Sequence, residues 1–198
     1  MKKYLIYILL ILSPLTHSLA YSSSPATETQ VVTHRLWCCP ELRNILTQIR
    51  SLPEGNALVN KILEEGPLTI KLNKNLSKEF NGYWDGDKRT VFITYSKSTS
   101  IDVLFPTLLF ELHNASRNQD FGKLDYLAHQ RQMSKQEYVR SVEYIEFENV
   151  QAVTQLLQKG KAQGLYPQSI EWNFSNDFEK HFYVQQKTGH SAWIAKGY

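Results

Sequence analysis

The chain has 198 residues, of which 22 are Lys or Arg and 19 are Asp or Glu, so its charge is nearly balanced. No basic run is interleaved with aromatic residues, which excludes the usual surface for nucleic-acid binding. The length suffices for one domain with a real core.

The first 20 residues have the pattern of a secretory signal peptide. Lys2 and Lys3 precede an apolar run from Tyr4 to Leu12, and small residues at Ser18 and Ala20 are typical of a cleavage site. The run is short for a membrane span, although an uncleaved anchor is the alternative. We therefore expect export to the periplasm or the exterior, with no membrane span after cleavage.

Residues 21–36 are mostly small and polar and predict a flexible leader, which leaves 37–198 as a single domain. Cys38 and Cys39 are the only cysteines, and neighbouring cysteines cannot form the disulfide framework of a secreted domain. A vicinal disulfide, two free thiols and an intermolecular bridge are all compatible with this pair. The domain must therefore be stabilised by packing.

The first half of the domain predicts two helices and a small sheet. Apolar residues recur every three or four positions after Pro40, and again over 56–65, as in amphipathic helices. The segment 68–74 alternates apolar and polar residues, and 80–95 has two β-prone runs around the turn Asp85–Lys88. We expect a small antiparallel sheet there.

The second half predicts long helices, at 100–118 and 135–158, joined by a polar connection. Gly160 is expected to cap the second of them, and a further helix is expected near 176–186. The fold class predicted is α+β, with a hairpin sheet packed on long helices.

Glu111 lies within an apolar run, and burial of an unpaired carboxylate is costly, so it requires a partner. On a helical wheel, Glu111 and Asn114 flank the apolar strip of their helix, whereas His113 projects from nearly the opposite side, towards the surface. Glu146 falls inside the buried arc of the second long helix, with Asn149 at its edge. Packing of the two helices would bring these four polar side chains together.

The remaining acids of the second helix, Glu137, Glu143 and Glu148, are expected outside its buried arc. His34, His129, His181 and His190 show no spacing typical of metal ligands, so no metal ligand is assigned. Buried glutamates can also serve only the specificity of packing.

A hairpin, a helix with Glu111 in the stretch FELHN and a later helix with Glu146 together resemble zincin metallopeptidases over roughly 68–158. In that family the motif HExxH supplies two zinc-binding His and a Glu as general base, and a downstream Glu completes one branch of it. Here Phe110 and Asn114 stand at the His positions, and Glu146 stands for the downstream acid. The resemblance therefore implies a degenerate site at which zinc is not bound in the usual way, so the cofactor is unknown.

Three functions follow from this pattern. The preferred one is a metallopeptidase-like pseudoenzyme or binding module with a pocket formed by Glu111, Asn114, Glu146 and Asn149. The second is an active metal-dependent hydrolase with oxygen-rich ligands, in which Glu111 and Glu146 act as ligands or acid–base groups. The third is a structural envelope protein.

The resemblance also implies the substrate-binding edge of the pocket. In zincins a strand near the active helix pairs with an extended peptide, and Tyr83 and Trp84 would occupy that strand here. The partner expected is accordingly a peptide or a protein, and the sequence indicates no oligomeric state.

Overall fold

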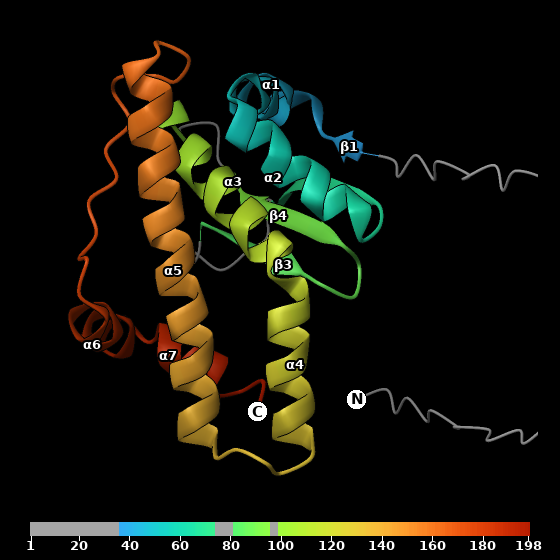
Figure 1. Cartoon of the computed structure of the whole chain (residues 1–198), viewed down its shortest axis with the longest axis vertical. Coiled ribbons are helices and arrows are strands. Elements are labelled where there is room, and N and C mark those ends of the chain that lie inside the picture. Colours follow the sequence, from blue (N-terminus) through green and yellow to red (C-terminus); the bar gives the residue numbers. More distant parts are fainter. Residues whose placement is uncertain (1–35, 74–80, 96–98) are drawn as a thin grey trace, which may run out of the picture. The chain divides into compact units, whose positions relative to one another are not determined.

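The computed structural model describes residues 36–73, 81–95 and 99–198 (Figure 1). The expected signal peptide, 1–20, and the leader up to residue 35 lie outside the described residues. Within the described part, no helix is both long enough and apolar enough to cross a bilayer.

The described chain starts with one strand, three helical segments and three further strands, and it is wholly helical after them. The strands are β1 (Leu36–Cys38), β2 (Leu68–Asn73), β3 (Gly82–Asp85) and β4 (Thr90–Thr94). The helices are η1 (Pro40–Leu42, 3-10), α1 (Arg43–Ser51), α2 (Pro53–Glu64), α3 (Ile101–Ser116), α4 (Asn118–His129), α5 (Lys135–Ala162), α6 (Phe178–Thr188) and α7 (His190–Ile194). The fold is therefore α+β.

The four strands form one mixed sheet in the order β1-β2-β4-β3, whereas the sequence predicted an antiparallel one. The hairpin β3–β4 is antiparallel as expected, with Trp84 opposite Val91. However, β1 and β4 both run parallel to β2. The chain passes through α1 and α2 between β1 and β2, a crossover connection that returns it in the same direction. The prediction of the hairpin could not reveal this, because strand direction depends on the connections.

The main core lies where α1, α2 and α3 pack together with the sheet. Leu104, Leu108 and Leu112 are fully or almost fully buried on α3, and Ile70 and Ile93 are buried on the sheet. Because α3 is covered on nearly every side, its sequence is apolar almost all round. This explains why a polar side chain on α3, such as Glu111, is drawn into the interior.

The helix α5 begins at a capping box, in which the Ser134 hydroxyl accepts a hydrogen bond from the Glu137 backbone N–H and the Glu137 carboxylate accepts one from the Ser134 backbone N–H. It continues through Gly160 rather than ending there, which corrects the prediction of a cap. A Cβ at Gly160 would lie 2.1 Å from the Tyr166 ring. This glycine is therefore a packing site, and it lets the aromatic ring close over the helix.

Two helices appear where the sequence analysis did not place them. α4 occupies most of the expected polar connection, and α7 follows α6 directly after Gly189, which has a left-handed backbone (φ 87°). α4, α5 and α7 share a second, smaller core around Ala128, Val142 and Ile194. α4 and α7 are thus stabilised by packing on α5, as their positions beside it in Figure 1 show.

Cys38 and Cys39 are both buried free thiols at the start of the domain. Burial raises the pKa of the Cys38 thiol to about 12, with a further contribution from Cys39. A thiol with such a pKa stays protonated at neutral pH and is a poor nucleophile.

Candidate functional site

Glu111 is buried on α3, with a side chain held by a short chain of amides. The Asn114 Nδ2 donates a hydrogen bond to Glu111 Oε2 at 3.0 Å. The Asn149 Nδ2 in turn donates to Asn114 Oδ1 at 2.8 Å, which joins α5 to α3. Three of the four residues that the helical wheels brought together are therefore linked directly. Asn149 lies behind Asn114 and orients its amide.

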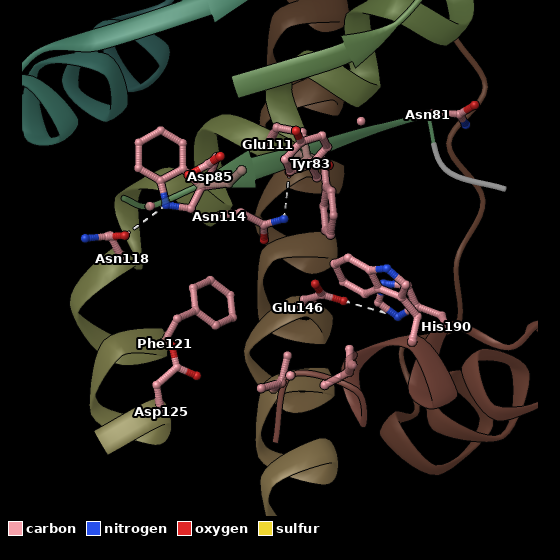
Figure 2. A pocket seen from close by; sticks show the side chains of 18 of the residues that line it. Asn81, Tyr83, Asp85, Glu111, Asn114, Asn118, Phe121, Asp125, Glu146 and His190 are labelled. Carbon is pink, nitrogen blue, oxygen red and sulfur yellow. Dashed lines mark hydrogen bonds and ion pairs between the residues drawn. The ribbon is translucent and has the colours of Figure 1, made fainter. Parts of the chain in front are cut away.

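The fourth residue, Glu146, lines the same pocket as Glu111. This pocket has a volume of about 1230 Å³ and is bounded by residues of β3, α3, α4, α5 and α7. Figure 2 shows Glu111 with Asn114 from α3, and Glu146 beside His190. The two carboxyl groups therefore share one cavity, and no hydrogen bond between them is needed for their charges to interact.

The pocket wall also includes the two aromatic residues that the resemblance singled out. Tyr83 and Trp84 lie on β3, the edge strand of the sheet, and both line the pocket. The Tyr83 ring stacks on Phe92 with centroids 4.9 Å apart. The Trp84 Nε1 donates to Asn118 Oδ1 at 2.9 Å. Both rings are thus held in place at the edge of the cavity.

Burial raises the pKa of Glu111 to about 8. The hydrogen bond from Asn114 opposes this shift, whereas the nearby charge of Glu146 adds to it. The His190 charge and the Trp84 backbone also favour the ionised carboxylate. Glu111 is therefore a carboxyl group that titrates close to neutral pH, as groups used for proton transfer often do.

His190, on α7, connects two glutamates of α5. Its Nδ1 lies 3.2 Å from Glu143 Oε1 and 3.6 Å from Glu146 Oε2. Burial opposes a charge on His190, but the hydrogen bond to Glu143 and the charge of Glu146 outweigh it and raise its pKa. Burial likewise raises the pKa of Glu146, to about 7, with His190 opposing and Glu143 adding to the shift. Sequence analysis missed His190, because 44 residues separate it in the chain from Glu146.

Glu143 is fully buried, which corrects the prediction that it lies outside the buried arc of α5. The wheel considered only one neighbour of α5, whereas α3 and α4 cover one part of it and α6 and α7 another. The Ser191 Oγ donates to Glu143 Oε1 at 2.6 Å. The spacing of three between Glu143 and Glu146 was a usable signal, since such residues share a helix face.

The residues at the two His positions of the zincin motif do not fit a zinc ion. The Phe110 ring packs on Trp172, with centroids 6.3 Å apart. The Asn114 amide is already committed to Glu111 and Asn149. A zinc site of the zincin kind is therefore not formed by this stretch.

His113 does not compensate for the missing ligands, and it is not a surface residue as expected. Its Nε2 is buried and has no hydrogen-bond partner among the described residues. Burial lowers the pKa of His113 to about 4, and the charges of Lys61 and Arg117 contribute. His113 is a half-buried residue of α3, the helix that contacts α2, and it is absent from the side chains that line the pocket.

No protein-family model, curated protein or solved structure matches the chain. The functional roles expected for Glu111, Glu146, Asn114, Asn149, Tyr83 and Trp84 accordingly stay predictions that rest on the geometry of the pocket. Among the described residues, one group can offer three metal-ligating atoms close together, and it consists of Glu143, Glu146 and His190.

Proposed function

We propose that this protein is an exported, metallopeptidase-like hydrolase that works without the zinc site of the zincin motif, with Glu111 as its proton-transfer group. The observation that carries the proposal is the shared pocket of Glu111 and Glu146, which come from two different helices. A merely structural glutamate has no need to face an open cavity of this size. Acid–base catalysis does need such access, because the group must reach the substrate.

The environment of Glu111 suits proton transfer near neutral pH. With a pKa of about 8, it carries its proton at pH 7 and can donate it to a leaving group. The protein holds the carboxyl by the amide of Asn114, whose own orientation is fixed by Asn149. Glu146 provides a second carboxyl in the same cavity and helps to keep the pKa of Glu111 high. These positions are set by the packing of α3 on α5 and need no rearrangement.

The edge strand β3 supports a peptide as the substrate class. Among the described strands only β4 pairs with β3, so backbone groups on the other side of β3 can pair with an extended chain. Tyr83 and Trp84 on this strand both line the pocket and provide apolar surface for side chains of the peptide. A peptide paired with β3 would lie next to Glu111, because β3 and α3 are in contact.

A second candidate is the binding module that the degenerate motif implies. Phe110 packs on Trp172 where a zinc ligand would be expected, which favours a pocket that retains peptide binding and has lost hydrolysis. The hydrolase and the binding module would bind a peptide in the same pocket, and they differ only in whether the peptide is hydrolysed.

The test uses the purified chain and a fluorogenic peptide library, and it compares the wild type with Glu111→Gln. We expect hydrolysis by the wild type and a loss of at least about 100-fold in the variant, the usual scale for an acid–base group. The matched control is Glu64→Gln, the same chemical change at an exposed position of α2, and its activity should be unchanged. Peptide binding without hydrolysis in the wild type would favour the binding module. Neither binding nor hydrolysis would contradict both candidates.

A further inference from the structure

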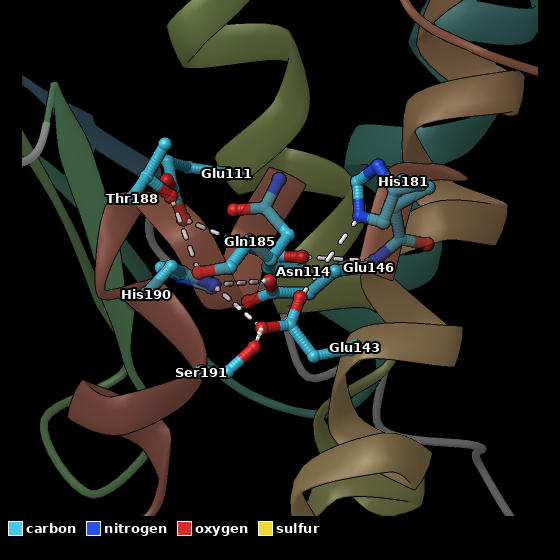
Figure 3. Close-up of polar contacts among 10 residues, drawn as sticks. Glu111, Asn114, Glu143, Glu146, His181, Gln185, Thr188, His190 and Ser191 are labelled. Atoms are coloured by element: carbon cyan, nitrogen blue, oxygen red, sulfur yellow. Dashed lines mark hydrogen bonds and ion pairs between the residues drawn. The ribbon is translucent and has the colours of Figure 1, made fainter. Parts of the chain in front are cut away.

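We propose that Glu143 and Glu146 of α5 and His190 of α7 bind one divalent transition-metal ion, with His181 of α6 as a fourth donor. One potential ligand atom from each of the first three residues lies within 4.8 Å of the other two. Donors bound to one ion at about 2.0–2.3 Å are typically separated by about 3–4 Å, so small side-chain rotations would complete the site. Figure 3 shows Glu143 with Glu146, His181 and His190 next to it.

Unpaired polar atoms at the same place provide a second, independent observation. Glu143 Oε2 and His181 Nε2 are both buried and have no hydrogen-bond partner among the described residues. They lie 3.9 Å from each other, and their side chains are 0% and 4% exposed. Leaving such atoms unpaired in a protein interior is costly. A cation between them would satisfy both at once.

The charges of the site also favour a dication. Once a bound ion has displaced the protons of these ligands, two carboxylates and two neutral imidazoles have a formal charge of −2, which a dication neutralises. The Ser191 hydroxyl donates to Glu143 Oε1 and fixes the carboxylate, as groups around metal ligands commonly do. Thus Ser191 would act as a positioning residue for Glu143.

The mixture of donors indicates the class of ion. Carboxylate oxygen together with imidazole nitrogen suits Zn²⁺ or Mn²⁺, whereas Ca²⁺ and Mg²⁺ prefer sites made only of oxygen ligands. This centre differs from the zincin one, which would use the positions of Phe110 and Asn114 on α3. Glu111 would face it across the pocket, since Glu146 and His190 line that pocket too. The catalytic use of the ion rests on the proposed function, whereas its binding does not.

The test measures binding of Zn²⁺ and Mn²⁺ to the chelator-treated chain without an affinity tag, by calorimetry and by elemental analysis after dialysis. We expect one ion per chain and a higher Tm with metal, because an ion that binds the native state stabilises it. His190→Asn should weaken binding at least tenfold. Its matched control, His129→Asn, changes an exposed histidine of α4 and should bind like the wild type.

Glu143 is wholly buried, so Glu143→Gln is paired with Glu146→Gln, whose side chain is 15% exposed and whose replacement is less disruptive. Loss of binding in either folded variant supports the site. Absence of bound Zn²⁺ and Mn²⁺ in the wild type, equal affinity in His190→Asn, or tighter binding of Ca²⁺ would overturn it. Hydrolysis that persists in excess chelator would refute a catalytic role for the ion, while binding at the site and the proposed function would both stand. Stoichiometric metal without hydrolysis would support the metal site and contradict the proposed hydrolase.

Discussion

Glu111 of α3 and Glu146 of α5 line one pocket, although the two residues are far apart in the chain and belong to different helices. The amides of Asn114 and Asn149 bridge the same two helices directly beside them. The contact between α3 and α5 therefore both closes the core and positions two acidic groups.

The first prediction concerns the pH dependence of stability. The pKa of Glu111 is about 8 in the fold and near 4.5 when unfolded, so the native state holds a proton between these values that the unfolded state has lost. Stability due to this group is therefore fully present below about pH 4.5 and falls as the pH rises to 8, with a slope of up to about 1.4 kcal/mol per pH unit.

Glu111→Gln should remove this contribution. Urea unfolding at pH 5, 6, 7 and 8 should give a flatter profile for the variant than for the wild type, and a variant more stable than the wild type at pH 8. Glu146 and His190 face Glu111 and titrate in both proteins, so the difference between the two profiles is the quantity to compare. Parallel profiles would show that Glu111 ionises normally.

The second prediction addresses the amide bridge. Asn149→Ala leaves the buried Asn114 Oδ1 without its donor, and we expect a loss of about 1–3 kcal/mol in the free energy of unfolding. The double variant with Asn114→Ala should lose less than the sum of the two single losses, with a coupling of about 1 kcal/mol. Asn60→Ala, on the exposed side of α2, is the control and should change little. Additive losses would mean that the two amides do not interact.

A pair of glycines gives the third prediction. Gly160→Ala places a Cβ 2.1 Å from the Tyr166 ring, so it should destabilise the protein by roughly 1–3 kcal/mol despite the higher helix propensity of alanine. Gly122→Ala on α4 meets no atom within 4 Å and should stabilise it by about 0.5–1 kcal/mol. The change in Tm of each variant on thermal unfolding measures these effects. If both substitutions shifted the Tm in the same direction, the packing of Tyr166 on α5 would be contradicted.

The fourth prediction concerns the edge of the pocket. Tyr83→Leu removes the ring that stacks on Phe92 beside the proposed peptide path. We expect KM for a peptide substrate to rise about tenfold, equivalent to about 1.4 kcal/mol, with kcat nearly unchanged. Tyr126→Leu, which alters an exposed tyrosine of α4 outside the pocket, should leave both constants as they are. An unchanged KM in Tyr83→Leu would exclude β3 as the binding edge.

Much of the fold is predictable from local patterns. The hairpin β3–β4 follows from its turn residues, and α3 and α5 follow from apolar periodicity. In contrast, the parallel pairing of β1, β2 and β4 depends on how the chain returns between strands. The helix α4 escapes prediction because only a few of its residues pack on α5, so its sequence is largely polar.

The candidate site likewise contains residues that can be identified from the sequence and residues that cannot. Glu111 and Glu146 can be identified because each interrupts an apolar helix face. Glu143 cannot be identified by that criterion, because it is buried by α6 and α7, whose positions are not encoded near it. His181 and His190 become neighbours of α5 only through the path of the chain after residue 162. Ligand sets assembled from distant segments leave no regular spacing in the sequence.

The most direct test of the shared pocket is a carbon-13 NMR titration of the Glu111 carboxyl in the metal-free chain, repeated in Glu146→Gln. We expect an apparent pKa of about 8 in the wild type and a lower value once the charge of Glu146 is removed, with Glu148→Gln, on the exposed side of α5, as a control without effect. A wild-type pKa near 4.5, or a value that Glu146→Gln leaves unchanged, would show that the two carboxyl groups do not interact in one pocket.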